Sequence, residues 1–339
     1  MKAIQIRSTN LLELVEQEIP QIAPDELLIQ TRAATICTSD LNDVHFNPFG
    51  IELPVILGHE GAGVVAQVGR EVVGFQPGDP VATHPVHPCG NCSTCRQGFP
   101  HLCLNMGHFG FNLPGTFAEY YVVRQDRCRR LAKSVDFATA ALVEPVCVCL
   151  EALAQARLAP GANLLVIGDG PFGILMTRLA SRFEPAKVVI AGYFDTRLAF
   201  ARGALTLNTR IRVNAIEGML APLDGDRYDA VILAVGSSQA FQQGLQCLRP
   251  RGRLVVFSAI HEPAPIDLFQ VHLKELEIIG ACSDLNRLDE AVVILQDEPD
   301  LLVDMITHRF RLEEYEKAFA QADQGKETAM KVAFVFDAP

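Results

Sequence analysis

The pattern of apolar and polar residues changes near residue 150, and this change divides the chain into two parts of different architecture. Before this point, short apolar runs are separated by Pro and Gly, a pattern typical of β-strands joined by tight turns. The predicted strands cover residues 2–6, 11–18, 26–34 and 60–68. Several short strands without intervening helices favour an antiparallel, barrel-like domain.

After residue 150, strand patterns alternate with helix patterns. Short apolar runs separated by helix-like stretches occupy residues 163–167, 187–191, 230–235 and 253–258. This alternation is typical of an α/β fold with a doubly wound parallel sheet, whose strands are buried on both faces. Near the C-terminus the alternation is lost, and an amphipathic stretch at 312–320 precedes a final strand at 331–336. We expect these last residues to rejoin the first domain.

Composition and charge narrow the classes of partner. Of the 339 residues, 49% are apolar, which is enough to build the cores of two domains. Glu144 and Pro145 interrupt the longest apolar run, at 140–153, and the N-terminus lacks a secretory segment, so we predict a cytoplasmic protein that does not bind membranes. The formal net charge of −11 and the single short basic tract at 127–130 disfavour nucleic acid as a partner.

Four of the ten cysteines have the spacing of a metal site. Cys89, Cys92 and Cys95 are each separated by two residues, and Cys103 follows after seven more. One loop can therefore present four sulfurs to a tetrahedral Zn²⁺, which leaves no position for a substrate. We predict a structural zinc here and a catalytic site elsewhere. Most of the remaining cysteines lie in apolar stretches, which fits a reducing compartment.

The second domain contains a glycine-rich turn, VIGDGPFG at 166–173, between a predicted strand and a predicted helix at 174–182. Gly168 permits a tight turn, Gly170 lets the backbone approach a pyrophosphate, and Gly173 lets the helix pack closely on the strand. The helix N-terminus then faces the negative charge of the ligand. We predict dinucleotide binding by this turn, including its residues Pro171 and Phe172.

The choice between NAD and NADP depends on residues after the next strand. A carboxylate that binds the adenosine ribose of NAD is expected about 20 positions after the last glycine, where this chain has Gly192. Asp195 either replaces it or caps the following helix, and Arg197 is the nearest cation for a 2′-phosphate. We favour NAD and leave NADP open. Asp169, beside the expected pyrophosphate, is expected to face outward.

Two short motifs in the first domain suggest a second zinc site. Cys37 and His59, together with a carboxylate from Glu60 or Glu144, would form three ligands with an open fourth position, as in catalytic zinc sites. Each residue alone also has an ordinary structural explanation, such as a buried thiol or a helix-start carboxylate. It is their occurrence together that indicates a metal site.

These motifs in this order resemble the zinc-dependent medium-chain dehydrogenase/reductase family of alcohol and polyol dehydrogenases. The resemblance rests on residues 37–40, 58–61, the four cysteines, 115–123, Glu144 with Pro145, and 166–173. It implies a GroES-like catalytic domain (1–150 and 286–339, with a zinc lobe at about 85–110) and a Rossmann domain (151–285). It also implies two zinc ions per chain, zinc at the cleft between the domains, and a homodimer or homotetramer.

The resemblance assigns roles to residues of the first domain. Cys37 and His59 become ligands of the catalytic zinc, with Glu60 or Glu144 as the carboxylate ligand. In a separate role, Asp40 orients the ring of His59, and Ser39 receives the substrate proton.

The proton relay departs from the family pattern. Many relatives have a histidine five residues after the zinc cysteine, where this chain has Asn42, which cannot transfer a proton. Either His45, further along the loop, or water would then complete the relay, or a different substrate would require another relay; we favour His45.

The resemblance implies hydride transfer between a nicotinamide cofactor and a secondary alcohol, because zinc lowers the pKa of an alcohol. The carboxylate ligand favours a polyol or sugar derivative, with an L-threonine-type amino alcohol as the alternative substrate. A non-catalytic dinucleotide-binding redox sensor or scaffold is a further alternative. The residues Cys37, His59, Glu60 and Glu144 argue against it, because a non-catalytic protein has no need of an open zinc site.

Overall fold

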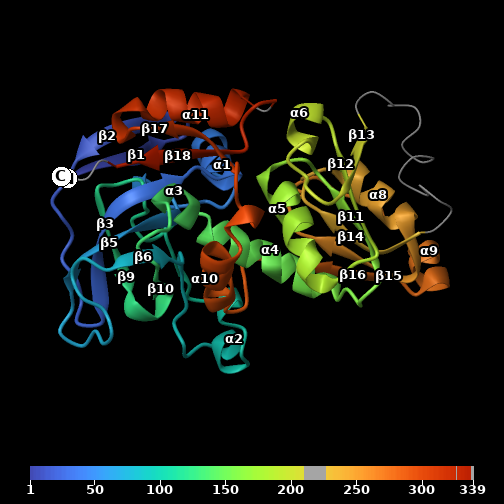
Figure 1. Ribbon diagram of the computed structural model, residues 1–339, viewed down its shortest axis with the longest axis horizontal. Helices are drawn as coiled ribbons and strands as arrows, with labels where there is room; N and C mark the ends of the chain where they lie inside the picture. The colour runs from blue at the N-terminus through green and yellow to red at the C-terminus, as the bar shows by residue number, and fades with distance from the viewer. Residues whose placement is uncertain (210–226, 326, 337–339) are drawn as a thin grey trace. The chain divides into compact units, whose positions relative to one another are not determined.

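The computed structural model describes residues 1–209, 227–325 and 327–336 (Figure 1). The chain forms two compact units. One contains Met1–Cys147 and Leu285–Pro339, so that it is built from both ends of the chain, and the other contains Val148–Asp284. We call them the terminal unit and the central unit.

The terminal unit is built around a seven-stranded sheet in which β3 is paired on both sides. The strand order is β10-β6-β5-β3-β18-β17, and β9 also pairs with β3. A smaller sheet has the order β2-β1-β4. Strand bounds are β1 Lys2–Ser8, β2 Leu11–Glu16, β3 Glu26–Thr35, β4 Val55–Ile56, β5 Glu60–Val68, β6 Pro80–Thr83, β9 Tyr120–Arg124, β10 Cys128–Arg130, β17 Ile306–Phe310 and β18 Lys331–Val335.

The C-terminal segment completes this sheet. Strand β18 pairs antiparallel with β3, and β17 pairs parallel with β18, so one pair departs from the predicted antiparallel arrangement. Helix α11 (Tyr315–Gln324) lies along both strands (Figure 1). The rings of Phe319 and Phe334 pack on that of Phe117 with centroids 6.0 and 5.1 Å away. Burial of these rings explains why the final residues belong to the terminal unit.

The central unit contains the predicted parallel sheet. Its strand order is β13-β12-β11-β14-β15-β16, and every pair is parallel. The order reverses between β11 and β14, which is where doubly wound sheets bind their ligands. The bounds are β11 Asn163–Ile167, β12 Lys187–Gly192, β13 Leu205–Asn208, β14 Tyr228–Leu233, β15 Leu248–Val256, β16 Glu277–Gly280, α5 Pro171–Leu179, α6 Asp195–Leu198, α8 Ser238–Cys247 and α9 Leu268–Lys274.

Helix α4 (Val143–Ala156) runs from the terminal unit into the central unit. Residues Phe137–Ala156 are long and apolar enough to cross a membrane, but 83% of the most apolar window is buried inside the structure, as in a core helix. The other helices and strands within the described residues are α1 Thr38–His45, α2 Ser93–Arg96, α3 Phe137–Ala140, α10 Leu288–Asp297, β7 Val86–His87 and β8 Gly107–His108. Short 3₁₀ helices are Pro100–Leu102, Gln125–Arg127, Ala180–Phe183, Pro299–Leu301 and Leu312–Glu314.

Candidate functional site

The four cysteines of the predicted structural site converge in the segment between β7 and β8, which we call the cysteine lobe. The sulfur atoms of Cys89, Cys92, Cys95 and Cys103 all lie within 4.8 Å of one another. Cys92 Sγ and Cys103 Sγ are 3.8 Å apart. Zn–S bonds of about 2.3 Å in a tetrahedron require sulfurs about 3.8 Å apart. The lobe therefore fits a closed four-thiolate zinc site.

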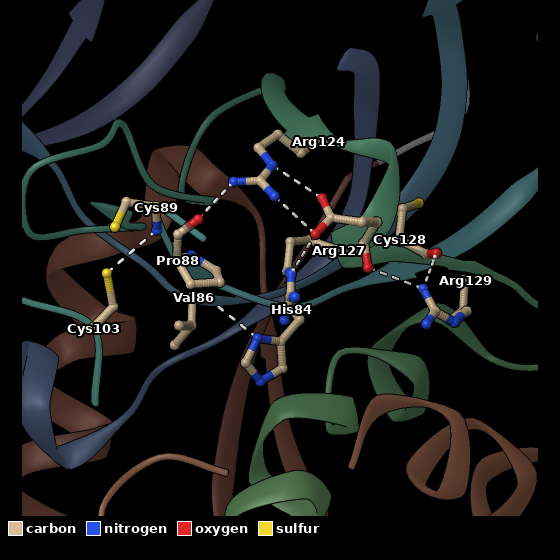
Figure 2. Close-up of polar contacts among 10 residues, drawn as sticks. His84, Val86, Pro88, Cys89, Cys103, Arg124, Arg127, Cys128 and Arg129 are labelled. Carbon is tan, nitrogen blue, oxygen red and sulfur yellow. Dashed lines mark hydrogen bonds and ion pairs between the residues drawn. The ribbon is translucent and has the colours of Figure 1, made fainter. Parts of the chain in front are cut away.

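Hydrogen bonds hold the cysteine lobe in place. The backbone N–H groups of Cys89 and Asn105 each donate to Cys103 Sγ at 3.3 Å. Arg124 donates to the carbonyl of Pro88 at 2.9 Å, so that a guanidinium anchors the chain immediately before the first cysteine (Figure 2). N–H donors stabilise negative charge on sulfur, which favours the thiolate form that zinc binds.

A second donor cluster forms where β3, α1 and β5 meet. One donor atom from each of Cys37, His59 and Glu60 lies within 4.8 Å of the others. Cys37 is the N-cap of α1, His59 precedes β5, and Glu60 is its first residue. All three are buried, with exposed fractions of 6%, 5% and 0%. A thiolate, an imidazole and a carboxylate in a buried position are a donor set that suits catalytic zinc.

Asp40 orients two members of this cluster. Its Oδ2 accepts the backbone N–H of Cys37 at 2.8 Å, and its Oδ1 lies 3.3 Å from His59 Nδ1. The other ring nitrogen of His59, Nε2, is then the one available to a metal. Ser39 Oγ lies 3.4 Å from that nitrogen. Burial lowers the pKa of His59, but the charges and hydrogen bonds of Asp40 and Cys37 together outweigh this and hold the pKa well above its usual value.

Glu60 has a partner that the sequence reasoning missed. The ammonium of Lys331, on β18, lies 2.5 Å from both carboxylate oxygens of Glu60 and 3.2 Å from the carbonyl of Ile36. Thr35 also donates to Glu60. Lys331 is 2% exposed, so this is a buried ion pair. The sequence feature that could have indicated a buried lysine is its position at the start of an otherwise apolar strand, KVAFV.

Glu144 lies in the first turn of α4 and is not part of the cluster formed by Cys37, His59 and Glu60. It is 9% exposed, and its Oε2 has no hydrogen-bond partner among the described residues. Burial, and then the charge of Glu60, raise the pKa of Glu144 to about 7, although nearby His59 lowers it. A buried carboxylate oxygen without a donor is a candidate for binding a cation.

His45 does not join the cluster. It is the last residue of α1, and its ring nitrogens lie 3.0 Å from Asn10 Oδ1 and 3.2 Å from Asp323 Oδ2. Both contacts are at a partly exposed surface of the terminal unit. The relay role of His45 therefore stays a prediction, and the contacts of its ring are with Asn10 and Asp323.

The same helix carries a buried carboxylate that the sequence reasoning missed, Asp43. It is 1% exposed, and burial together with the charge of Asp40 raises its pKa to about 7.

The glycine-rich turn of the central unit has the shape of a phosphate cradle. Gly168 has φ +125°, and a Cβ on Gly173 would lie 1.9 Å from the carbonyl oxygen of Gly168. Gly170 is the N-cap of α5. Among the residues that the structure describes, no side chain caps the first-turn amides, and a Cβ on Gly170 would meet nothing within 4 Å. Open space before uncapped amides fits a pyrophosphate. Pro171 is the first residue of α5, and the Phe172 ring lies 5.3 Å from that of Phe257.

Asp169 does not face outward, contrary to our expectation. It is 8% exposed, and its Oδ2 accepts the backbone N–H groups of Tyr193 and Phe194 at 2.6 and 2.7 Å. The expectation was wrong because these amides, at the end of β12, provide donors that the linear sequence does not reveal. Asp195 is exposed at the start of α6 and accepts from Asn208 at 2.8 Å.

Arg197, the candidate cation for a 2′-phosphate, is also in α6. Its guanidinium lies 5.9 Å from the ring centroid of Phe194.

Both units match known protein families. Residues 23–133 match the family described as alcohol dehydrogenase GroES-like domain, and residues 171–296 match the family described as zinc-binding dehydrogenase. The first match includes the cysteine lobe and the Cys37 cluster, and the second begins within the glycine-rich turn.

Curated relatives match over nearly the whole chain. Sorbitol dehydrogenase of Bombyx mori is 28% identical, covering 97% of each chain. D-xylulose reductase A of Aspergillus oryzae is 30% identical, covering 92% of this chain and 90% of the relative. L-threonine 3-dehydrogenase of Anaeromyxobacter dehalogenans is 29% identical, covering 91% of each. Relatives named for polyols and sugars thus occur beside one named for an amino alcohol.

Similar solved structures were obtained with either dinucleotide. A zinc-binding dehydrogenase from Sinorhizobium meliloti 1021, bound to NADP, has a TM-score of 0.91 and 25% identity and covers 99% of both chains. An alcohol dehydrogenase from Escherichia coli CFT073, complexed with NADH, has a TM-score of 0.90 and 26% identity, again with 99% coverage of both. The fold alone therefore does not determine which dinucleotide this chain prefers.

Proposed function

The chain belongs to the zinc-dependent medium-chain dehydrogenase/reductase family, and we propose that it oxidises a secondary alcohol of a polyol or sugar derivative with NAD. The observation that carries this proposal is the convergence of Cys37 and His59 in a buried position, with Glu60 beside them and all three donor atoms within 4.8 Å of one another, separate from the cysteine lobe. A closed four-thiolate site cannot bind substrate, so a second donor cluster is what an enzyme of this kind requires.

The donor sets fit two zinc ions per chain. The four thiols of the cysteine lobe would hold a structural ion, and Cys37 with His59 would hold a catalytic one. We propose Glu144 as the third ligand, because its buried Oε2 has no hydrogen-bond partner in the described part of the chain, whereas both oxygens of Glu60 contact Lys331. When bound, the catalytic zinc supplies a Lewis acid that makes an alcohol more acidic, and the nicotinamide accepts the hydride.

Residues beside the cluster would position the reacting groups and accept the proton. Asp40 fixes the tautomer of His59, because a carboxylate at Nδ1 leaves Nε2 free for the metal. Ser39 Oγ, 3.4 Å from Nε2, is placed to accept the alcohol proton and pass it to water. With Asn42 in place of the family's histidine, water rather than a side chain would continue the relay.

The polyol assignment rests on the donor chemistry and on the names of several relatives. Adjacent hydroxyls can occupy two positions of an expandable zinc coordination shell. The relative named L-threonine 3-dehydrogenase keeps an amino alcohol as the second candidate substrate.

The test is NADH formation by zinc-replete protein with NAD⁺ and, separately, D-sorbitol, xylitol, D-altritol and L-threonine. We expect turnover on at least one polyol, and its abolition in Cys37→Ser with the zinc of the cysteine lobe retained. Turnover on L-threonine alone would replace the polyol assignment. No turnover on any alcohol, with zinc present at both sites, would contradict the proposal.

The assembly and location remain predictions from the sequence. We propose a homodimer or homotetramer, as the family resemblance implies, and a cytoplasmic location, which fits the cysteines in apolar stretches. Light scattering on the purified holoenzyme measures the subunit number, and a monomeric mass would contradict the oligomer.

A further inference from the structure

Gly192 lies where the dinucleotide fold expects its ribose-binding carboxylate, at the end of β12. The residue is buried, and it has no side chain with which to bind a ribose. The space that a side chain would need is nevertheless occupied. A Cβ built on Gly192 would lie 2.3, 2.5 and 2.6 Å from Cβ, Cγ and Oδ2 of Asp169.

We propose that Asp169, from the glycine-rich turn, supplies the ribose carboxylate that position 192 lacks and thereby selects NAD over NADP. This inference rests on the proposed function, because it assumes that the central unit binds a nicotinamide dinucleotide. The carboxylate reaches the end of β12 from the neighbouring strand–helix turn instead of from β12 itself.

The hydrogen bonds of Asp169 leave one oxygen for a ligand. Oδ2 accepts both backbone N–H groups, of Tyr193 at 2.6 Å and of Phe194 at 2.7 Å. Among the described residues, no group donates a hydrogen bond to Oδ1. Asp169 as a whole residue is 8% exposed. A fixed carboxylate with a free oxygen is suited to accept hydrogen bonds from the 2′- and 3′-hydroxyls of a ribose.

The same contacts disfavour a 2′-phosphate. In this position a phosphate would meet the negative charge of Asp169 at short range. Backbone amides at the end of a strand are natural phosphate donors, but those of Tyr193 and Phe194 are already engaged by Oδ2. Arg197 is the cation that would otherwise favour a phosphate; burial lowers the pKa of its guanidinium, and the charge of Asp169 acts in the opposite direction.

Asp195 is less suited to this role. It is exposed at the start of α6, and its Oδ1 accepts from the side chain of Asn208 at 2.8 Å. It therefore provides a matched control, since it is a carboxylate near the same loop that makes a different contact.

The experiment measures NADH and NADPH binding directly, by ligand fluorescence, in zinc-replete protein without an alcohol. The main variant is Asp169→Asn, whose amide oxygen can still accept from the two backbone N–H groups. A charged hydrogen bond contributes about 1.5–3 kcal/mol, so we expect the Kd for NADH to rise about 10- to 100-fold. The Kd for NADPH should stay constant or fall, whereas Asp195→Asn should change both by less than about twofold.

A second variant exchanges the two side chains. Asp169→Gly with Gly192→Asp moves the carboxylate to the position that the fold expects, and it also removes the Cβ that would clash. We expect this double variant to recover most of the NADH affinity lost in Asp169→Asn. It also keeps the test decisive if Asp169→Asn weakens the loop, which circular dichroism would detect.

The outcomes separate this inference from the proposed function. Equal changes in NADH and NADPH binding in Asp169→Asn, or no change, would overturn the role of Asp169 while leaving the enzyme assignment intact. Preference of the unaltered protein for NADPH would also overturn it. Failure of the unaltered protein to bind either dinucleotide would refute the proposed function and this inference together.

Discussion

The buried ion pair between Lys331 and Glu60 makes a sharp prediction about stability. The two side chains are 3% and 0% exposed and lie 2.5 Å apart. Replacing Lys331 with Met leaves the carboxylate of Glu60 buried without its counter-charge, although Thr35 still donates to it. Removing one partner of a buried pair costs about 3–5 kcal/mol, chiefly because the remaining charge is unpaired.

The assay is thermal unfolding, followed by circular dichroism, with the zinc content of each variant measured in parallel. For a unit of this size, the expected loss lowers Tm by roughly 10 °C. Lys317→Met is the matched control, because Lys317 pairs with Glu314 at 3.3 Å but is 73% exposed. Its expected effect is below about 1 kcal/mol.

A double variant tests whether the loss comes from the unpaired charge. Glu60→Gln alone should also destabilise, because it leaves the Lys331 ammonium buried without its carboxylate. Glu60→Gln with Lys331→Met should lose much less than the sum of the single variants, since neither charge is then left unpaired. Additive losses, or a Lys331→Met effect no larger than that of Lys317→Met, would refute the reasoning.

Three further variants test other parts of the structure. Cys103→Ser should lower the zinc content by one ion per chain, measured by mass spectrometry, whereas Cys282→Ser, an exposed free cysteine, should not change it. Phe334→Ala should destabilise by about 3–5 kcal/mol in denaturant unfolding, because the ring is fully buried; a loss below about 1 kcal/mol would contradict this packing. The hydrogen bond from Arg253 lowers the pKa of Glu277, so the pair stabilises the fold above the usual glutamate pKa, and its contribution is lost as pH falls through the lowered value. Glu277→Gln should therefore lower Tm at pH 8 and progressively less below pH 4.5, while Glu275→Gln, in a longer exposed pair, serves as the control.

Much of the fold could be predicted because the relevant signals are local. Short apolar runs separated by Pro and Gly predicted a strand at 60–68, and the structure has β5 over the same residues. The parallel sheet of the central unit was also predictable, because its buried strands appear in the sequence as apolar runs, and the structure confirms it. The convergence of the four cysteines could also be predicted, because they lie within one short segment and have the spacing of a zinc site.

The features that were missed depend on contacts between distant residues. Lys331 and Glu60 are separated by 271 positions, and nothing in either local sequence indicates the partner. The inward turn of Asp169 depends on two amides 24 and 25 positions later. The parallel pairing of β17 with β18 likewise depends on how the C-terminal segment returns to the sheet. Periodicity describes which face of an element is buried but not what it meets there.

The charges around the catalytic cluster lead to a final prediction, about its third ligand. Lys331 already neutralises Glu60 through contacts with both of its oxygens. Zn²⁺ bound by the Cys37 thiolate and neutral His59 retains one positive charge, which a second carboxylate would cancel. Under the proposed ligand set, Glu144 would supply that carboxylate, because its buried Oε2 has no hydrogen-bond partner among the described residues. Glu60 would then neutralise Lys331, and Cys37 with Glu144 would neutralise the zinc ion.

Glu144→Gln should therefore lose the catalytic zinc and keep the ion in the cysteine lobe, giving one zinc per chain by mass spectrometry. Glu60→Gln should be less stable but should retain both ions when zinc is supplied, because its main contact is with Lys331 and not with the metal. The reverse pattern, with zinc lost in Glu60→Gln and retained in Glu144→Gln, would show that Glu60 leaves Lys331 to bind the metal. In that case the pairing of Glu60 with Lys331 and of Glu144 with zinc would be wrong, and Lys331 would compete with zinc for the carboxylate of Glu60.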